Sequence, residues 1–224
     1  MLPKRKLEGK NMVLLQERDK QKIIQVHYWK KMMKETNEVI GKLHGIVLLI
    51  HNSVEFSDIV DFLNKIRSDE QLHVLYISLV NSYSRIKETL KEHPLKSKQL
   101  FVVDCVSGFL IELRDSPECA YRKPPGNLEQ LKELLMKFIG SQNPNIVVID
   151  SMSQFINFST PTEEELEDFY KFLRSIKENI WGLSNDSIIL LYDDKVGYLQ
   201  SLPTISIDLI LKLEVIREKP RWKD

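Results

Sequence analysis

The chain has 224 residues, of which 42% are hydrophobic, and its formal net charge at pH 7 is zero. This length can bury one full-sized hydrophobic core. No apolar stretch approaches 18 residues, and the N-terminal MLPKRKLEGK lacks the apolar core of a signal peptide. The two cysteines, Cys105 and Cys119, have neither CxxC spacing nor enough partners for a metal site, so we interpret them as structural thiols. We therefore expect a cytoplasmic protein that does not cross a membrane.

The first 44 residues are basic. They carry eleven Lys and Arg against five Asp and Glu, a net charge of +6 that the remaining 180 residues balance with −6. This asymmetry indicates a basic arm on a mildly acidic body. Such an arm is either a solvated surface or an electrostatic docking site, and nucleic acid is one partner it would suit, together with the C-terminal REKPRWKD.

A helical spacing runs through the second half of this basic arm. Apolar or small side chains recur at alternating intervals of three and four, at Val26, Trp29, Met33, Thr36, Ile40 and Leu43. The spacing predicts a largely helical extension over residues 1–44, packed either on its own domain or against another subunit. We take Val26, Trp29, Met33 and Ile40 as the candidate interface. Upstream, NMVLLQERDKQKIIQV either continues the helix or forms a hairpin around ERDK.

From Gly45 onward, short apolar runs rich in Val, Ile and Leu predict buried strands. These runs are Gly45 to Ile50, Leu72 to Leu79, Leu100 to Val106, Asn145 to Ile149, Ser187 to Tyr192 and Ile207 to Ile216.

Amphipathic segments lie between several of these runs and predict helices. Their apolar faces comprise Phe56, Ile59, Val60, Leu63 and Ile66, then Leu128, Leu131, Leu134, Leu135 and Phe138, and finally Leu166, Phe169, Tyr170, Leu173 and Ile176. Asn127 with Gln130, and Thr160 with Glu163, fit capping boxes at two helix starts.

Strands that alternate with helices favour right-handed crossovers. We therefore expect a three-layer α/β domain over residues 45–224, with a mainly parallel sheet and helices on both faces. The stretch from Ser107 to Gly126 is longer than a usual crossover loop and contains three prolines, which is typical of a functional or partly disordered loop.

Ligands of open α/β sheets bind at the carboxyl ends of the strands. After the first strand comes HNSVEF, which has neither the glycines nor the lysine of a phosphate loop. We interpret Asn52 or Ser53 as the N-cap of the next helix and His51 as a locally bonded histidine. Four carboxylates, Asp104, Asp150, Asp193 and Asp194, end the later strands.

The segment NIVVIDSMSQF is similar to the Walker B strand of the RecA, RadA and KaiC group of ATPases, in which an apolar run ends in an Asp. The segments GIVLLIHNS, LHVLYISLVNSYSRIKETL, KQLFVVDCVS and SIILLYDD resemble the other core strands of that fold. The stretch from VLYISLVNSYSRIKETL to FVVDCVS most resembles archaeal proteins that are described as degenerate members of the superfamily. The resemblance covers roughly residues 45 to 216.

The resemblance implies that Asp150 matches the Asp that supports magnesium, whereas Walker A has no counterpart between Ile50 and Asp58. Leu79 and Val80 fall near the place of the KaiC-type carboxylate pair. The superfamily strand order would put the first strand between the fourth and the fifth.

That strand order would place Asp150 and Asp193 beside the altered loop, with Asp104 one strand further out. We therefore name these three as a candidate site for a divalent cation. A receiver-like fold also places Asp residues at strand ends, but it needs an acidic pocket after the first strand.

We predict a non-catalytic RecA/KaiC-like domain that serves as a binding, scaffold or regulatory module, without a cofactor, through self-association or a protein partner. One alternative is an unorthodox ATPase that binds magnesium and ATP with Asp150 and a cation from elsewhere, such as Lys195 or the loop of Arg122 and Lys123. Another is a nucleic-acid-binding accessory protein that uses the basic arm.

Overall fold

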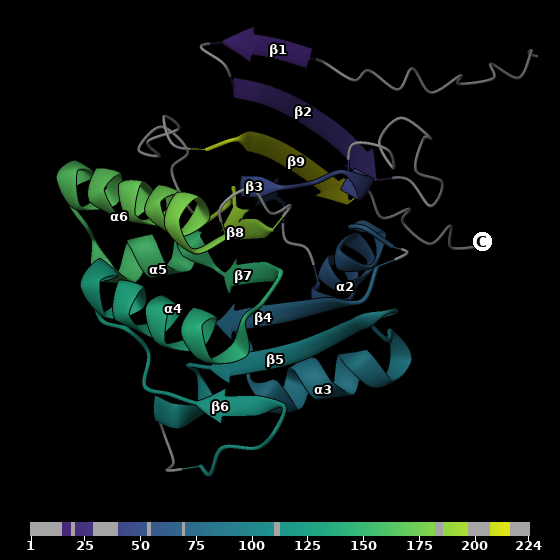
Figure 1. The fold of residues 1–224 in the computed structure, drawn as a ribbon, viewed down its shortest axis with the longest axis vertical. Coiled ribbons are helices and arrows are strands. Elements are labelled where there is room, and N and C mark those ends of the chain that lie inside the picture. Colours follow the sequence, from purple (N-terminus) through teal and green to yellow (C-terminus); the bar gives the residue numbers. More distant parts are fainter. Residues whose placement is uncertain are drawn as a thin grey trace, which may run out of the picture.

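The alternating runs of the sequence fold into a sheet with helices on both faces (Figure 1). The computed structural model describes residues 15–18, 21–28, 40–52, 55–68, 70–109, 113–181, 186–196 and 207–215. Within these residues the strands are β1 (Leu15–Arg18), β2 (Gln21–Tyr28), β3 (Gly45–His51), β4 (Leu72–Ser78), β5 (Lys98–Asp104), β6 (Cys119–Tyr121), β7 (Ile146–Asp150), β8 (Ser187–Asp193) and β9 (Leu209–Val215).

The described strands form one sheet in the order β1-β2-β9-β3-β8-β7-β4-β5-β6. Neighbouring strands pair in parallel except β1 and β2, which are antiparallel. The predicted mainly parallel α/β sheet is confirmed, and the six strands predicted after Gly45 lie within about two residues of their expected ends. The strand β6 lies inside the proline-containing stretch that the sequence indicated only as a long loop.

The described helices are α2 (Phe56–Lys65), α3 (Tyr83–Glu92), α4 (Leu128–Gln142), α5 (Met152–Ser159) and α6 (Glu163–Ile176), with a 3-10 turn at Ser107–Phe109 and a π-helical turn at Lys177–Trp181. The start of α4 is as predicted, because the Asn127 side chain accepts a hydrogen bond from Gln130 N. The start of α6 differs from the prediction of Thr160 with Glu163. Thr162 and Glu165 form its capping box, while Thr160 adopts a left-handed conformation and ends α5.

Two apolar clusters fill the space between the sheet and its helices. The residues of α4, α5 and α6 pack with one face of the sheet, and those of α2 and α3 pack with the other. Figure 1 shows the resulting three layers, with α4 and α6 on one side of the sheet and α2 and α3 on the other. Each fully buried Leu or Ile stabilises the fold by roughly 1.5–3 kcal/mol. The expected three-layer architecture is therefore confirmed.

The N-terminal segment differs from its prediction. The strands β1 and β2 pair antiparallel, from Leu15 opposite Ile24 to Arg18 opposite Gln21, and β2 joins the main sheet through seven parallel pairs with β9, from Lys22 opposite Leu209 onward. The helical prediction is therefore wrong for residues 15–18 and 21–28, and the antiparallel pairing of these strands agrees with the hairpin alternative. Val26 lies in β2.

The remaining candidate interface residues have different outcomes. Ile40 is 2% exposed and packs in the cluster on the α2 side of the sheet, so its side chain belongs to the core of the domain. Trp29 and Met33 lie outside the described residues. The predicted helix is thus wrong at Val26, and the predicted contact with another molecule stays a prediction.

Asp208 ties the last strand to the rest of the domain. Its carboxylate accepts hydrogen bonds from Ile46 N at 2.8 Å, Arg174 Nη1 at 2.8 Å and Lys177 Nζ at 3.0 Å. Gly45, at the start of β3, has φ +83°, and a Cβ there would lie 2.4 Å from Asp208 Oδ2. Glycine is needed at this position for its left-handed backbone and for the close approach of the carboxylate.

Candidate functional site

The carboxyl ends of the parallel strands lie along one edge of the sheet. His51 at the end of β3 pairs with Asp193 of β8, and Ser78 of β4 pairs with Asp150 on one side and with Asp104 on the other. The parallel register therefore brings the strand-end residues to this edge, where the sequence predicted a site.

The order of the strands separates these residues more than we expected. The first core strand, β3, lies between β8 and β9 and not beside β7. Asp193 is thus the neighbour of His51, Asp150 lies one strand beyond Asp193, and Asp104 lies two strands beyond Asp150. The predicted placement of the first strand between the fourth and the fifth is wrong, because β8 is inserted between β3 and β7.

Asp104 has a structural role. It is fully buried, and its carboxylate accepts hydrogen bonds from Tyr83 N at 2.7 Å and from Val106 N and Ser107 N, both at 2.8 Å. These bonds fix the turn after β5 and the start of α3. Its oxygens are used by the backbone, so Asp104 is not available as a metal ligand.

Asp150 is held by polar groups from β4 and the turn that follows it. The Tyr76 hydroxyl donates a hydrogen bond to Asp150 Oδ2, and Asn81 Nδ2 donates to the same oxygen at 3.3 Å. Burial raises the pKa of the Asp150 carboxyl, although these two hydrogen bonds oppose the shift. Tyr76 is fully buried, and burial and the Asp150 charge raise its own pKa well above the ordinary value. The peptide bond between Asp150 and Ser151 is cis.

Asp193 and His51 lie at the ends of adjacent strands. Asp193 Oδ1 accepts a hydrogen bond from Lys195 N at 2.9 Å, and the Asp193 N–H donates to Ser153 Oγ at 3.0 Å. His51 is 7% exposed. Burial lowers the pKa of His51, against the opposing charges of Asp193 and Asp194. Asp193 therefore closes the turn after β8, and His51 is held mainly in its neutral form near neutral pH.

A cavity of about 270 Å³ lies among these strand ends. Its polar lining includes His51, Asn81, Arg85, Asp150, Gln154 and Asp193. Of the three predicted metal ligands, Asp150 and Asp193 thus share this cavity, and Asp104 does not line it. Among the described residues, no group of three or more His, Cys, Asp and Glu side chains is arranged to hold a metal ion. The predicted three-carboxylate site is therefore not formed.

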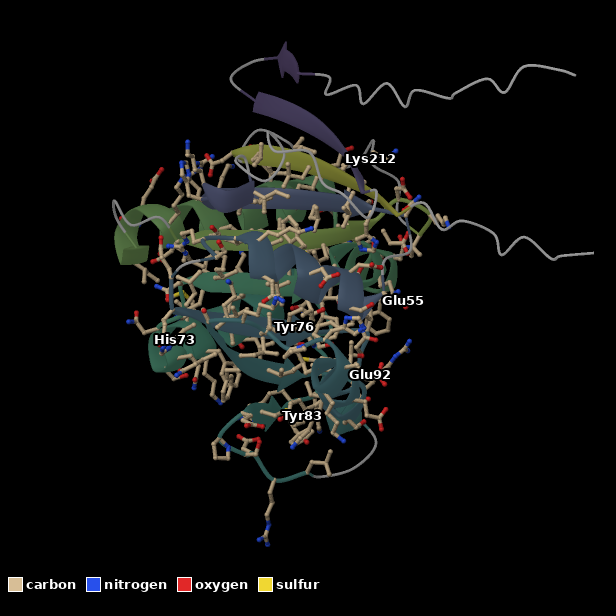
Figure 2. All side chains as sticks on the ribbon, turned by 90° about the vertical axis from the view of Figure 1, so that its right-hand side faces the viewer. Glu55, His73, Tyr76, Tyr83, Glu92 and Lys212 are labelled. Atoms are coloured by element: carbon tan, nitrogen blue, oxygen red, sulfur yellow. The ribbon has the colours of Figure 1, made fainter. Side chains whose placement is uncertain are left out.

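The start of α2 carries carboxylates of the chain itself. Glu55 is the N-cap, which corrects the prediction of Asn52 or Ser53, and the Asp58 carboxylate accepts a hydrogen bond from Glu55 N at 3.0 Å. Phe56 and Ile59 of this helix line the cavity. Figure 2 shows Glu55 at the surface and Tyr76 inside the molecule. A helix N-terminus attracts anions, and Glu55 and Asp58 bring two carboxylates of the chain itself to this one.

No family model matches the chain, and no curated protein matches it. Solved structures match the chain. The flagellar accessory protein FlaH from Methanocaldococcus jannaschii matches with a TM-score of 0.50 and 11% identity, over 80% of this chain and 76% of FlaH. The KaiC-like protein PH0186 from Pyrococcus horikoshii OT3 matches with a TM-score of 0.45 and 12% identity, over 80% of this chain and 74% of that one. The chain shares the fold of FlaH, a RecA-like α/β sheet with helices on both faces.

The described residues around the cavity do not fit the magnesium-ATP that the resemblance to RecA-like ATPases implies. Val80 lines the cavity near the place of the expected carboxylate pair, and no lysine is among the lining residues. Arg122, one alternative cation, is engaged by Asp115 at 2.7 and 2.8 Å. Neither Lys123 nor Lys195 lines the cavity. The volume of about 270 Å³ is also below the range of roughly 300–1,000 Å³ that is usual for small-molecule pockets.

Sequence reasoning missed several residues of this site. Tyr76 sits inside an apolar strand and Asn81 follows that strand, where we looked for a carboxylate. Arg85 and Gln154 carry no motif and reach the cavity only through the placement of α3 and α5. Within the part of the chain that the structure describes, no helix is long and apolar enough to cross a membrane.

Proposed function

We propose that this chain is a non-catalytic RecA/KaiC-like domain that acts as a binding or regulatory module and does not hydrolyse ATP. The domain keeps the sheet of an ATPase and uses it as a rigid support. Its partner is a protein or a second copy of the chain, and it works in the cytoplasm without a cofactor.

The observation that carries this proposal is the pair of carboxylates at the start of α2. Glu55 caps the helix, and Asp58 accepts a hydrogen bond from the Glu55 N–H. A phosphate placed there would meet like charges, at a cost of about 4 kcal/mol for each unit pair near 4 Å and an effective dielectric of about 20. The helix start that binds phosphate in nucleotide-binding folds therefore repels it in this chain.

The environment of Asp150 supports the same proposal. A carboxylate that supports magnesium has to be ionised and within reach of the ion's water shell. Asp150 is 7% exposed, its pKa is raised by burial, and Tyr76 and Asn81 bind one of its oxygens. These features suit a residue that fastens β7 to β4 and to the turn after β4.

Titration of the full chain with ATP and magnesium tests the proposal. We expect no saturable binding of labelled ATP up to about 1 mM, and no phosphate release above background. The Asp150→Ala variant should leave this baseline unchanged. An exposed carboxylate variant, Glu129→Gln on α4, serves as the matched control for the change in charge.

Saturable ATP binding that requires magnesium and is abolished by Asp150→Ala would refute the proposal and favour the unorthodox ATPase. Salt-sensitive retardation of DNA or RNA would instead favour the nucleic-acid-binding alternative, which we predicted from the basic first 44 residues. Binding of magnesium or calcium that raises the melting temperature would restore a cation role for Asp150 and Asp193.

A further inference from the structure

The outer edge of β5 is only half paired. β6 pairs with Val102, Val103 and Asp104. Among the described residues, no strand lies beside residues 98–101 on that side. Four residues of open edge span about 13 Å, at roughly 3.3 Å per residue. This is long enough for a short extended segment to add to the sheet.

The open edge presents backbone hydrogen-bonding groups. Val102 N donates to Glu118 O at 2.9 Å on the outer side of β5. Because backbone groups alternate between the two sides of a strand, Lys98 and Leu100 direct their N–H and C=O groups the same way. Neither residue has a strand partner there among the described residues. The edge therefore offers two donors and two acceptors in a row.

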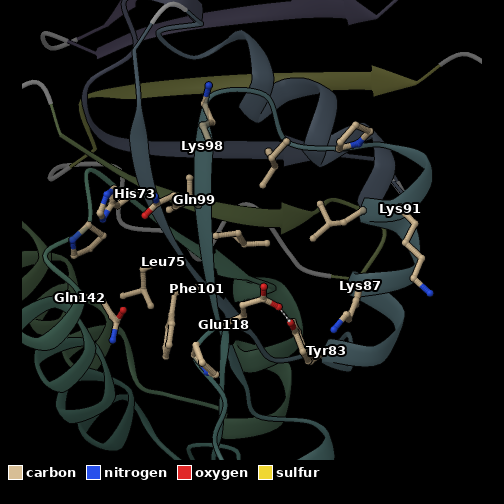
Figure 3. Close-up of a pocket in the computed structure, with 17 residues that line it drawn as sticks. His73, Leu75, Tyr83, Lys87, Lys91, Lys98, Gln99, Phe101, Glu118 and Gln142 are labelled. Atoms are coloured by element: carbon tan, nitrogen blue, oxygen red, sulfur yellow. Dashed lines mark hydrogen bonds between the residues drawn. The ribbon is translucent and has the colours of Figure 1, made fainter.

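A groove of about 600 Å³ surrounds this open edge. Figure 3 shows Tyr83, Lys87 and Lys91 on one side of β5, and Leu75, His73 and Gln142 on the other. The apolar side chains that line the groove are Val74, Leu75, Leu90, Leu95, Leu100 and Phe101, with Pro94, Pro117 and Pro144. Simple protection of an edge strand needs only charges or prolines. A groove with apolar walls on both sides is suited to hold side chains as well.

The charges along the groove favour an acidic occupant. Lys87 and Lys91 lie exposed on α3 and carry the positive charge of the groove, whereas the Lys98 ammonium group is buried. Glu118 is the acidic residue among the described lining residues, and its carboxylate accepts a hydrogen bond from the Tyr83 hydroxyl at 2.7 Å. The groove thus has a net positive charge, which attracts and orients a segment of opposite charge.

We propose that this groove binds an extended segment of a partner protein, in which apolar and acidic residues alternate, as an added strand on the open edge of β5. The segment's main chain bonds to Lys98 and Leu100, and its side chains alternate between the two walls of the groove. The groove lies at the amino-terminal half of β5, away from the cavity at the carboxyl ends of the strands. The proposed peptide binding is therefore separate from the proposed lack of ATP hydrolysis. Binding of ATP to the chain would refute the lack of hydrolysis and would leave the peptide-binding proposal unaffected.

Fluorescence anisotropy with the full chain tests this inference. The probes are two fluorescein-labelled ten-residue peptides, one with Leu alternating with Glu and the other with Leu alternating with Lys. We expect the acidic peptide to bind at least about tenfold more tightly than the basic one. The double variant Lys87→Glu with Lys91→Glu should reverse this preference. The control Lys123→Glu, an exposed residue outside the groove, should leave it unchanged.

A second variant tests the backbone contact. Leu100→Pro removes the outward N–H without removing a bond to β4, so the domain should fold and bind the acidic peptide at least about tenfold more weakly. Leu100→Val keeps the N–H and should still bind. If Leu100→Pro unfolds, hydrogen exchange of the wild-type chain decides instead, because the acidic peptide should slow exchange at Lys98 and Leu100.

Three results would overturn the inference. The first is equal binding of the two peptides, or no binding of either. The second is binding that survives both the charge reversal and the loss of the N–H at Leu100. The third is displacement of the acidic peptide by an oligothymidylate, since nucleic acid would then be the occupant of the groove. Displacement of the peptide when the chain dimerises, with dimerisation measured by light scattering, would likewise show that a second copy of the chain is the occupant.

Discussion

The substitution Asp208→Ala tests how the last strand is fastened to the domain. The Asp208 carboxylate holds the N–H of Ile46, a fully buried residue, at 2.8 Å and pairs with Arg174 and Lys177. Losing the acceptor of a buried N–H costs about 1–3 kcal/mol. Each partly exposed ion pair adds about 0.2–1 kcal/mol. We therefore expect Asp208→Ala to lower the free energy of unfolding by about 2–4 kcal/mol.

Urea denaturation measures this loss. With an m value of about 2 kcal/mol/M, the unfolding midpoint should fall by about 1–2 M. Asp208→Asn keeps an oxygen for Ile46 N, so it should lose only the ion pairs and cost less than about 2 kcal/mol. The reasoning is wrong if the Ala and Asn variants are equally destabilised, or if Arg174→Met alone costs as much as Asp208→Ala.

Three further predictions concern stability. Gly45→Ala should cost at least about 2 kcal/mol in urea, because φ is +83° and the new Cβ would meet the Asp208 carboxylate; a cost below about 0.5 kcal/mol would contradict this. Burial lowers the pKa of His51 from its ordinary value of 6.5, so the unfolded chain binds more protons than the folded chain just below pH 6.5. The melting temperature should therefore fall as the pH falls from 6.5 toward the lowered pKa, and His51→Gln should flatten this dependence. Burial raises the pKa of Asp150 from 3.8, so the folded chain binds more protons than the unfolded chain just above pH 3.8. The stability of the fold should therefore fall as the pH rises from 3.8 through the raised pKa, and Asp150→Asn should remove this slope in thermal melts.

The core of the fold was predictable because its signal is local. Strands that are covered on both faces need nearly continuous apolar runs, and the runs after Gly45 match β3, β4, β5, β7, β8 and β9 closely. The cap at Asn127 was also predictable, since a side-chain acceptor three residues before its donor is enough. The shift from Thr160 to Thr162 at α6 was not, because both residues precede an acidic residue at the same spacing.

The sequence did not decide between a helix and a hairpin for the N-terminal strands, because the pattern there satisfies two periods at once. Val26 belongs to a helical series with Trp29 and Met33, but Ile24, Val26 and Tyr28 also alternate with a period of two. Parallel pairing of β2 with β9, about 185 residues away, decides between them. Tertiary pairing of this kind leaves no mark within a window of the sequence.

The site was predicted in part. The sequence identified Asp150, Asp193 and His51 as strand-end residues, and these line one cavity. It did not separate them from Asp104, since a carboxylate that binds three backbone N–H groups has the same sequence context as one that faces a cavity. It also could not supply the strand order, which depends on where β8 inserts.

The strand order also sets a constraint on synthesis. β3 is made early, yet its two neighbours, β8 and β9, are the last of the described strands to leave the ribosome. For more than 130 residues of elongation, the apolar run of β3 has no partner on either edge. Chains fold from the N-terminus during synthesis, and an unpaired apolar strand is prone to aggregate. We therefore expect the nascent chain to need a chaperone until β8 and β9 have left the ribosome.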